Sequence, residues 1–322
     1  MILGTSVVSV IIKVPVFVAV LISNTFVVSI WMSPKVRSPI TVVLSTIAVC
    51  DLLTFFCGTI FTVSDYFGGK TQIPTYCYLT RISMEFAYIW HSISILSTTF
   101  LALQRCVVCA FPFAGPRMCG MKSTKIFAIA FFIVALIPAL PDLMIRNIEH
   151  FEITTTENIT AFKCKTNYVL GENSMSKIYI VYNQYGLFVL SLAPAIIISF
   201  CMVVILITIN RRKLVTGHSS DQRSKTRTTT MLLMIMFIFV VGEFPGTLYS
   251  VYASFFPNTY TWLRSTMGVW FINMFMAVSY LVNVWVYIAM SKLFRERFFE
   301  LLCRFNIKQR TNTNQTSSTP RV

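Results

Sequence analysis

The chain has 322 residues, of which 55% are hydrophobic and only 12% are charged, and its formal net charge is +15. Soluble globular domains carry about 25% charged residues, so this composition excludes a soluble fold of this size. A largely disordered chain is excluded as well, because disorder requires low hydrophobicity. Strongly basic chains can bind nucleic acid, but here the Lys and Arg residues lie between long apolar segments. The natural solvent for such a chain is the lipid bilayer.

Seven apolar segments are long enough to cross a membrane. About 20 apolar helical residues span a hydrocarbon core that is about 30 Å thick. No segment alternates apolar and polar residues with period two, so a β-barrel pattern is absent from the sequence. We therefore predict an all-α membrane protein, a seven-helix bundle over residues 1–303, with a disordered polar tail at 304–322. The predicted helices are 7–32, 40–65, 78–109, 123–145, 178–209, 229–255 and 266–290, followed by an amphipathic helix at 291–303.

The basic residues predict the orientation of the bundle. Lys and Arg gather in cytosolic loops of membrane proteins. Most of them fall on one side if the N-terminus lies outside, whereas the opposite loops mix both signs of charge. This predicts an extracellular N-terminus and a cytosolic tail. We expect no cleaved signal peptide, because the first segment is too long for one and ends at Ser33-Pro34-Lys35.

Two of the nine cysteines lie on the predicted outer side. Cys77 stands at the start of the third segment, and Cys164 lies in the longest outer loop, 146–177. An oxidising compartment favours a disulfide between them, with two free thiols as the alternative. Asn158 opens an Asn-Ile-Thr glycosylation sequon in the same loop. On the inner side, Cys303 is either palmitoylated or an unmodified thiol.

Polar residues inside membrane helices are costly and mark function by default. Asp51 lies in the middle of the second segment, where a carboxylate among amides and hydroxyls can hold water or a small hard cation such as Na⁺. The alternative is a buried polar network that only fixes helix packing. The residues assigned to this polar core are Asn24, Asp51, Ser94, Ser279 and Asn283.

A second carboxyl group, Glu243, lies deep in the sixth segment with no Lys or Arg nearby in the sequence. Such a group either takes up a proton or receives a cationic ligand. Pro245, two residues further on, predicts a kink and a pivot in this helix. His91 is either a packing residue or a ligand contact. The candidate ligand contacts are Arg81, Glu85, Trp90, His91, Glu243 and Trp270.

Signatures of catalysis are absent from the sequence. No His, Cys and Asp set has metal-ligand spacing, and no phosphate-binding loop or nucleophile elbow occurs. We therefore do not expect an enzyme. A transporter or channel would need a continuous polar path through the bundle, and the inner halves of the fourth to sixth segments are almost wholly apolar.

Six motifs occur in order along the predicted helices. They are Asn24 in helix one, Asp51 in helix two, Gln104-Arg105-Cys106 at the inner end of helix three, Pro194 in helix five, Pro245 in helix six, and Asn283-Val284-Trp285-Val286-Tyr287 in helix seven. This order resembles that of the rhodopsin-like G-protein-coupled receptors over nearly the whole chain, with Gln-Arg-Cys in place of Asp-Arg-Tyr and Asn-Val-Trp-Val-Tyr in place of Asn-Pro-x-x-Tyr. The resemblance implies a two-state switch in which helix six pivots near Pro245 and opens a cleft for a heterotrimeric G protein.

Two shorter motifs narrow the resemblance. Gly242-Glu243-Phe244-Pro245-Gly246 has Glu where most of the family has Trp, and Met290-Ser291-Lys292-Leu293-Phe294-Arg295 follows helix seven. Both are similar to the nematode class w serpentine receptors, which are akin to FMRFamide-type and myosuppressin-type peptide receptors. The resemblance implies a peptide ligand at the plasma membrane. The basic residues on the inner side also suit anionic lipid. A receptor for small odorants is the alternative within the family.

The switch motifs depart from the family pattern in two places. Gln104 replaces the acid that normally clamps the neighbouring arginine, and Lys225 stands near the position of a second acid. Arg105 is therefore freer to move together with Tyr287, and we expect signalling without ligand. Val284 replaces proline, so the seventh helix should kink less.

Overall fold

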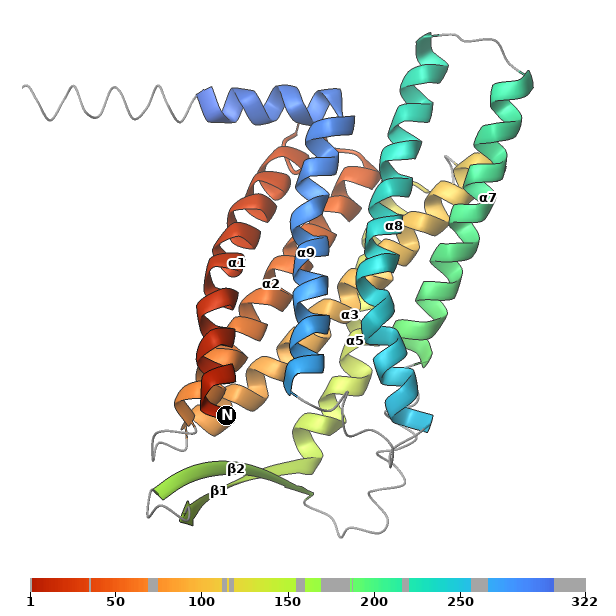
Figure 1. Ribbon diagram of the computed structural model, residues 1–322. Helices are drawn as coiled ribbons and strands as arrows, with labels where there is room; N and C mark the ends of the chain where they lie inside the picture. The colour runs from red at the N-terminus through yellow and green to blue at the C-terminus, as the bar shows by residue number, and fades with distance from the viewer. Residues whose placement is uncertain are drawn as a thin grey trace, which may run out of the picture.

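The structure is a computed structural model that describes residues 2–34, 36–68, 75–111, 115, 119–154, 160–168, 186, 188–215, 220–255 and 266–303. Long helices run up and down side by side, and their ends gather at two opposite faces (Figure 1). We call the face that carries the helical segment 292–303 the tail end, and the opposite face, which carries a β-hairpin, the hairpin end. The long helices are α1 (Ile2–Trp31), α2 (Pro39–Gly68), α3 (Thr75–Ala110), α5 (Met121–Ile145), α7 (Ala193–Val215), α8 (Ser220–Phe255) and α9 (Thr266–Met290).

Six of the described helices are long and apolar enough to cross a membrane: α1, α2, α3, α7, α8 and α9. The seventh, α5, has 25 residues and turns Ile126, Ile129 and Ile133 outward. Exposed apolar side chains of this kind are stable only against lipid. The seven-helix membrane bundle predicted from the sequence is therefore confirmed.

Several helices continue beyond their predicted ends. α8 begins at Ser220 rather than 229, α7 ends at Val215 rather than 209, and α3 begins at Thr75 rather than 78. The reason is that hydropathy marks where the bilayer ends, whereas the backbone hydrogen bonds of a helix continue through polar residues. The predicted start of the fifth helix, 178–187, lies almost entirely outside the described residues. Its described part opens with a π-helical turn, η1 (Phe188–Leu192), which leads directly into Pro194 of α7.

The loop 146–177 contains secondary structure that the sequence analysis missed. Strands β1 (Arg146–Thr154) and β2 (Thr160–Tyr168) pair antiparallel, with His150 opposite Cys164 and Glu149 opposite Lys165. Both strands contain β-branched and aromatic residues, which favour strands. The sequence analysis described this segment only as a loop, and the ribbon lies across the hairpin end of the bundle (Figure 1).

Helix α3 runs through the centre of the bundle despite its many hydroxyl residues. Ser92, Thr98 and Thr99 are buried, and each hydroxyl donates to the carbonyl four residues earlier, at 2.8–2.9 Å. These local bonds satisfy the hydroxyls where no water is present. α3 can therefore pack centrally, and the apolar core around it is densest toward the tail end, where Leu44, Leu101, Ile205, Leu232 and Met236 are almost fully buried.

Candidate functional site

A buried carboxylate, Asp51, links α2 to α3 in the middle of the bundle. Its side chain is 2% exposed, and the Ser94 hydroxyl donates to Oδ1 at 2.6 Å. A short hydrogen bond to a carboxylate is strong, particularly at low dielectric. The structure therefore joins two of the five residues that the sequence analysis assigned to the polar core.

The other three members of that predicted core are oriented differently. The Asn24 amide donates to Val20 O of its own helix at 3.1 Å, and the Ser279 hydroxyl donates to Met276 O at 2.7 Å. The Asn283 Oδ1 atom is buried and has no hydrogen-bond partner among the described residues. An orphaned buried acceptor is costly, so the Asn283 carbonyl oxygen is available to a donor or a cation that the described residues do not supply.

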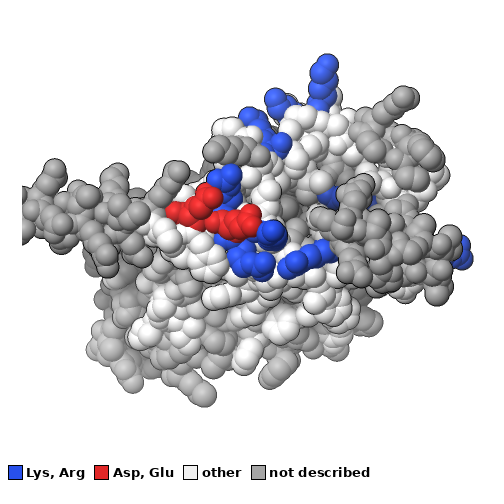
Figure 2. Space-filling view, turned by 90° about the horizontal axis from the view of Figure 1, so that it is seen from above, with Lys and Arg blue, Asp and Glu red and all other residues white. Residues whose placement is uncertain are grey.

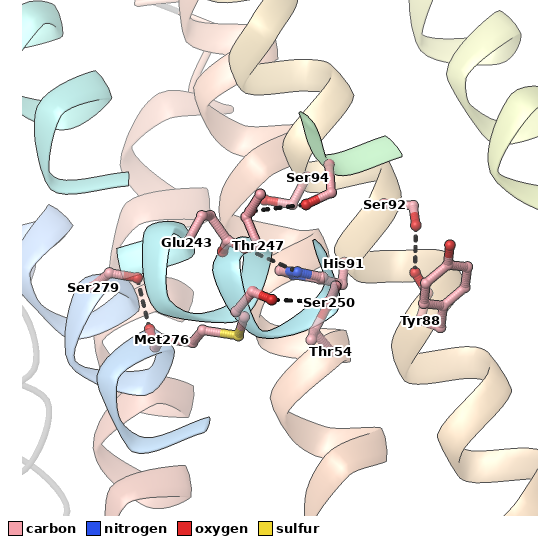
Figure 3. A network of polar contacts seen from close by, with 12 residues as sticks. Thr54, Tyr88, His91, Ser92, Ser94, Glu243, Thr247, Ser250, Met276 and Ser279 are labelled. Carbon is pink, nitrogen blue, oxygen red and sulfur yellow. Dashed lines mark hydrogen bonds and ion pairs between the residues drawn. The ribbon is translucent and has the colours of Figure 1, made fainter. Parts of the chain in front are cut away.

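A second polar group joins three helices, one turn of α3 nearer the hairpin end than Ser94. His91 of α3 approaches Glu243 of α8, with Nε2 3.2 Å from Oε2, and its Nδ1 lies 3.2 Å from the Tyr280 hydroxyl of α9. Figure 3 shows Glu243 and His91 pointing toward one another from their two helices. Both nitrogens of one imidazole are thus used, one on each neighbouring helix. The Glu243 side chain is 8% exposed, and its other oxygen, Oε1, has no partner among the described residues.

Close packing of α8 against α9 surrounds this group. A Cβ atom added to Gly242 would lie 2.8 Å from Ser279 Cβ, and one added to Gly246 would lie 2.7 Å from Met276 Cε. Small residues spaced four apart allow membrane helices to approach closely. The two glycines on either side of Glu243 therefore hold α8 directly on α9, and Pro245 lies between them in an unbroken helix.

At the tail end, no ion pair joins Arg105 to an acidic side chain among the described residues. Its Nε and Nη2 atoms are buried without hydrogen-bond partners among the described residues. Gln104 is 4% exposed and directs its amide to the Thr124 hydroxyl at 3.3 Å, toward α5. The Cys119 thiol lies 3.9 Å from the Gln104 carbonyl oxygen, and burial raises its pKa, although Arg105 lowers it. Within the described part of the chain, no carboxylate therefore compensates the charge of Arg105.

Tyr287, the other predicted switch residue, lies inside an aromatic cluster. Its ring centroid is 5.6 Å from that of Trp31 and 5.3 Å from that of Phe294. Phe298 packs on Phe294 at 6.3 Å. These edge and offset contacts attach the tail end of α9 to α1 and to the helix 292–303. α9 is one continuous helix from Thr266 to Met290, and Val284 lies within it.

Basic side chains gather at the tail end, with one small acidic patch among them (Figure 2). Arg227 of α8 donates to Ala289 O of α9 at 3.3 Å, and Arg295 donates to Ile288 O at 3.3 Å. The helix 292–303 carries two local ion pairs, Lys292–Glu296 and Arg297–Glu300. Cys303 is exposed at the end of this helix.

The predicted ligand contacts do not form one group. Glu85 is buried and Arg81 half-buried near the hairpin end, and each has an interaction partner. Trp90 packs its ring against Phe132 of α5 at 6.3 Å, so it faces a different helix from His91. The side chain of Trp270 lies outside the described residues.

The predicted modification sites are described only in part. Cys77 is buried in α3 and is not among the free cysteines, whereas the side chain of Cys164 lies outside the described residues. Asn158 is outside them as well. The disulfide and the glycan therefore stay predictions.

Two features of the site escaped the sequence analysis. Lys13 of α1 donates to the Thr62 hydroxyl of α2 at 2.7 Å, and a lysine within the first apolar segment was a visible signal. The pairing of His91 with Glu243 was not visible, because it joins residues that are 152 positions apart in the chain. Only the packing of α3 against α8 brings them together.

Comparisons with known proteins agree with this architecture. The model of the rhodopsin family of seven-transmembrane receptors matches residues 23–287. The chain therefore belongs to the rhodopsin family of seven-transmembrane receptors, whose members are receptors rather than enzymes.

Its relatives include receptors named for a peptide. The sex peptide receptor of Drosophila melanogaster is 25% identical over 319 residues, which cover 91% of this chain and 72% of that protein. The sex peptide receptor-related protein 2 of Caenorhabditis elegans is 24% identical over 83% of this chain and 65% of that protein. A rhodopsin of Lethenteron camtschaticum is 27% identical over 84% of this chain and 72% of that protein.

Proposed function

We propose that this receptor binds an extracellular peptide of the amidated, FMRFamide-like class and activates a heterotrimeric G protein at the plasma membrane. The observation that carries the proposal is Glu243, a carboxylate buried between α3, α8 and α9 whose Oε1 has no partner among the described residues. A cationic group, such as the guanidinium of an Arg-Phe-amide peptide, complements it. The two sex peptide receptor relatives support a peptide over a small odorant.

The proposed mechanism assigns the hairpin end to the outside of the cell and the tail end to the cytosol. A ligand that binds one conformation better shifts the population toward it. The tail end of α8 then moves away from α3, and Arg105, which has no acidic partner among the described residues, becomes available to a G-protein segment. The basic side chains at the tail end also favour anionic lipid.

A peptide screen tests this function. We expect cells that carry the receptor and a promiscuous G protein to respond to at least one peptide ending in Arg-Phe-amide, and not to neutral volatile compounds. The control is Arg105→Ala at matched surface expression, which should be silent to the same peptides. A response to volatiles with none to amidated peptides would reject the peptide assignment.

The outer location of the segment 146–177 gives a separate prediction. The Asn158→Gln variant should migrate faster than the parent on a denaturing gel, by the mass of one glycan, and enzymatic deglycosylation should remove the difference. Asn314→Gln should leave the mobility unchanged, because we place that second sequon in the cytosol. The same assignment places the proposed Cys77–Cys164 disulfide on the oxidising side. Equal mobility of the Asn158→Gln variant and the parent would contradict this topology.

We also propose that Na⁺ binds at Asp51, with Ser94 and the orphaned Asn283 carbonyl oxygen as its other protein ligands. Oxygen atoms of this kind suit a hard cation. Bound Na⁺ would supply the positive charge that Asp51 lacks in the bundle centre. Cys303, exposed beside Arg304, is the proposed palmitoylation site.

A further inference from the structure

The imidazole ring of His91 links α3 to both α8 and α9. Nε2 of His91 meets Glu243 of α8, and Nδ1 meets Tyr280 of α9, both at 3.2 Å. The tautomer with hydrogen on Nε2 donates to the carboxylate and accepts from the tyrosine hydroxyl, and the imidazolium donates to both groups. In either form both contacts are hydrogen bonds, so the link does not depend on the charge of the ring.

The two helices that His91 holds are themselves joined along their length. Gly242 brings α8 against Ser279 of α9, and Gly246 brings it against Met276. Nearer the tail end, Arg227 donates to the Ala289 carbonyl. α8 and α9 are therefore packed as one unit. His91 of α3 contacts this unit through its bonds to Glu243 and Tyr280.

Glu243 has two oxygens in different situations. Oε2 is held by His91, whereas Oε1 is buried and has no hydrogen-bond partner among the described residues. A buried carboxylate oxygen without a donor is unfavourable, and the cost falls when a charged donor arrives. A guanidinium binds both oxygens of a carboxylate through two parallel N–H···O bonds. A guanidinium that enters at the unpartnered Oε1 and also takes Oε2 therefore displaces His91 from Glu243.

We propose that His91, Glu243 and Tyr280 form a latch that keeps the α8–α9 unit on α3 in the resting receptor, and that a guanidinium or ammonium group of the ligand opens it by taking over Glu243. This inference rests on the proposed receptor function and adds to it. His91 and Tyr280 are positioning residues, because they act through the carboxylate, and Glu243 is the ligand anchor. Opening moves α8 and α9 together rather than α8 alone.

The latch is tested first without ligand, in detergent-solubilised full-length receptor and in cells. His91→Phe keeps an aromatic ring but removes both bonds, and Tyr280→Phe removes one. We expect each variant to melt at a lower temperature than the parent and to raise ligand-free signalling, by at least about fivefold for His91→Phe, the lower range of coupling between sites. Phe244→Leu is the matched control, because Phe244 adjoins Glu243 in sequence but is 57% exposed toward lipid.

A double-variant cycle shows whether the two groups act through each other. The variant with both His91→Phe and Glu243→Gln should melt no lower than the less stable single variant. The reason is that His91→Phe already removes the contact that Glu243→Gln weakens. Full additivity of the two shifts would overturn the latch, as would single variants that melt and signal like Phe244→Leu. The melting data decide this point even if the receptor activates no G protein, an outcome that would reject only the proposed function.

The ligand arm uses Phe-Met-Arg-Phe-amide and the same peptide with citrulline in place of arginine, which keeps the shape but removes the charge. The parent should prefer the arginine peptide by at least about tenfold, the effect of a charge-assisted bond of roughly 1.5 kcal/mol. In Glu243→Gln this ratio should fall to about one. An unchanged ratio would overturn the assignment of Glu243 as the anchor. If neither peptide activates the parent, this peptide class is rejected as the ligand, and the cycle alone decides the latch.

Discussion

Gly242→Ala should destabilise the receptor by about 1–3 kcal/mol, the usual effect of inserting an extra carbon into a packed core. The added Cβ would lie 2.8 Å from Ser279 Cβ, an atom fixed to the backbone of α9. Neither helix can relieve this contact by changing a rotamer, so the helices must separate. The melting temperature of the solubilised receptor and its surface expression should both fall.

Two other glycines serve as controls for this effect. At Gly246 the added Cβ would meet Met276 Cε, the end of a flexible side chain, and at Gly58 nothing lies within 4 Å. Alanine is the better helix former by up to about 1 kcal/mol, so Gly58→Ala should be neutral or stabilising and Gly246→Ala close to neutral. Equal melting temperatures for all three variants would contradict the close approach of α8 to α9.

Gln104→Glu should lower ligand-free signalling by about tenfold, which corresponds to roughly 1.4 kcal/mol of added stability for the resting state. The parent is expected to signal without ligand, because two buried donors of Arg105 have no partner in the described part of the chain. A carboxylate next to it supplies the missing charge, and hydrogen bonds between charged groups are about twice as strong as neutral ones. The measurement is basal G-protein activation at matched surface expression.

The control for the Gln104 variant is Leu103→Met, which changes a 42% exposed, lipid-facing neighbour on the same helix. It should signal like the parent. If Gln104→Glu also signals like the parent, the absence of the acid does not set the basal activity, and the freedom assigned to Arg105 is wrong.

The bundle itself could be predicted from the sequence, because a span of lipid dictates about 20 apolar residues per helix. The starts of α2 and α9 were predicted to within one residue. The end of α7 and the start of α8 could not be predicted in the same way, since polar residues such as Arg211 and Gln222 continue these helices beyond the apolar segment. Hydropathy does not reveal the ribbon of β1 and β2, because both strands are short and rich in polar residues.

The site was predicted less completely than the fold. Asp51 and Ser94 were assigned to one polar core and are in contact. His91 and Glu243 were assigned separately, as a packing residue or ligand contact and as a carboxyl without a nearby cation. Their pairing depends on the rotation of α3 and α8 about their own axes. Both helices carry polar residues on more than one side, so a single sequence does not show which side of α3 faces α8.

The aromatic cluster at the tail end has a consequence for the terminal helix 292–303. Tyr287 is 2% exposed and Phe294 is fully buried, and both rings pack against the Trp31 ring. If Tyr287 moves toward the centre of the bundle, its ring must lose its contact with Phe294. The packing of the terminal helix therefore opposes this movement. The lipid composition of the membrane, which sets how strongly the helix 292–303 binds to the bilayer, should therefore affect how readily the receptor is activated.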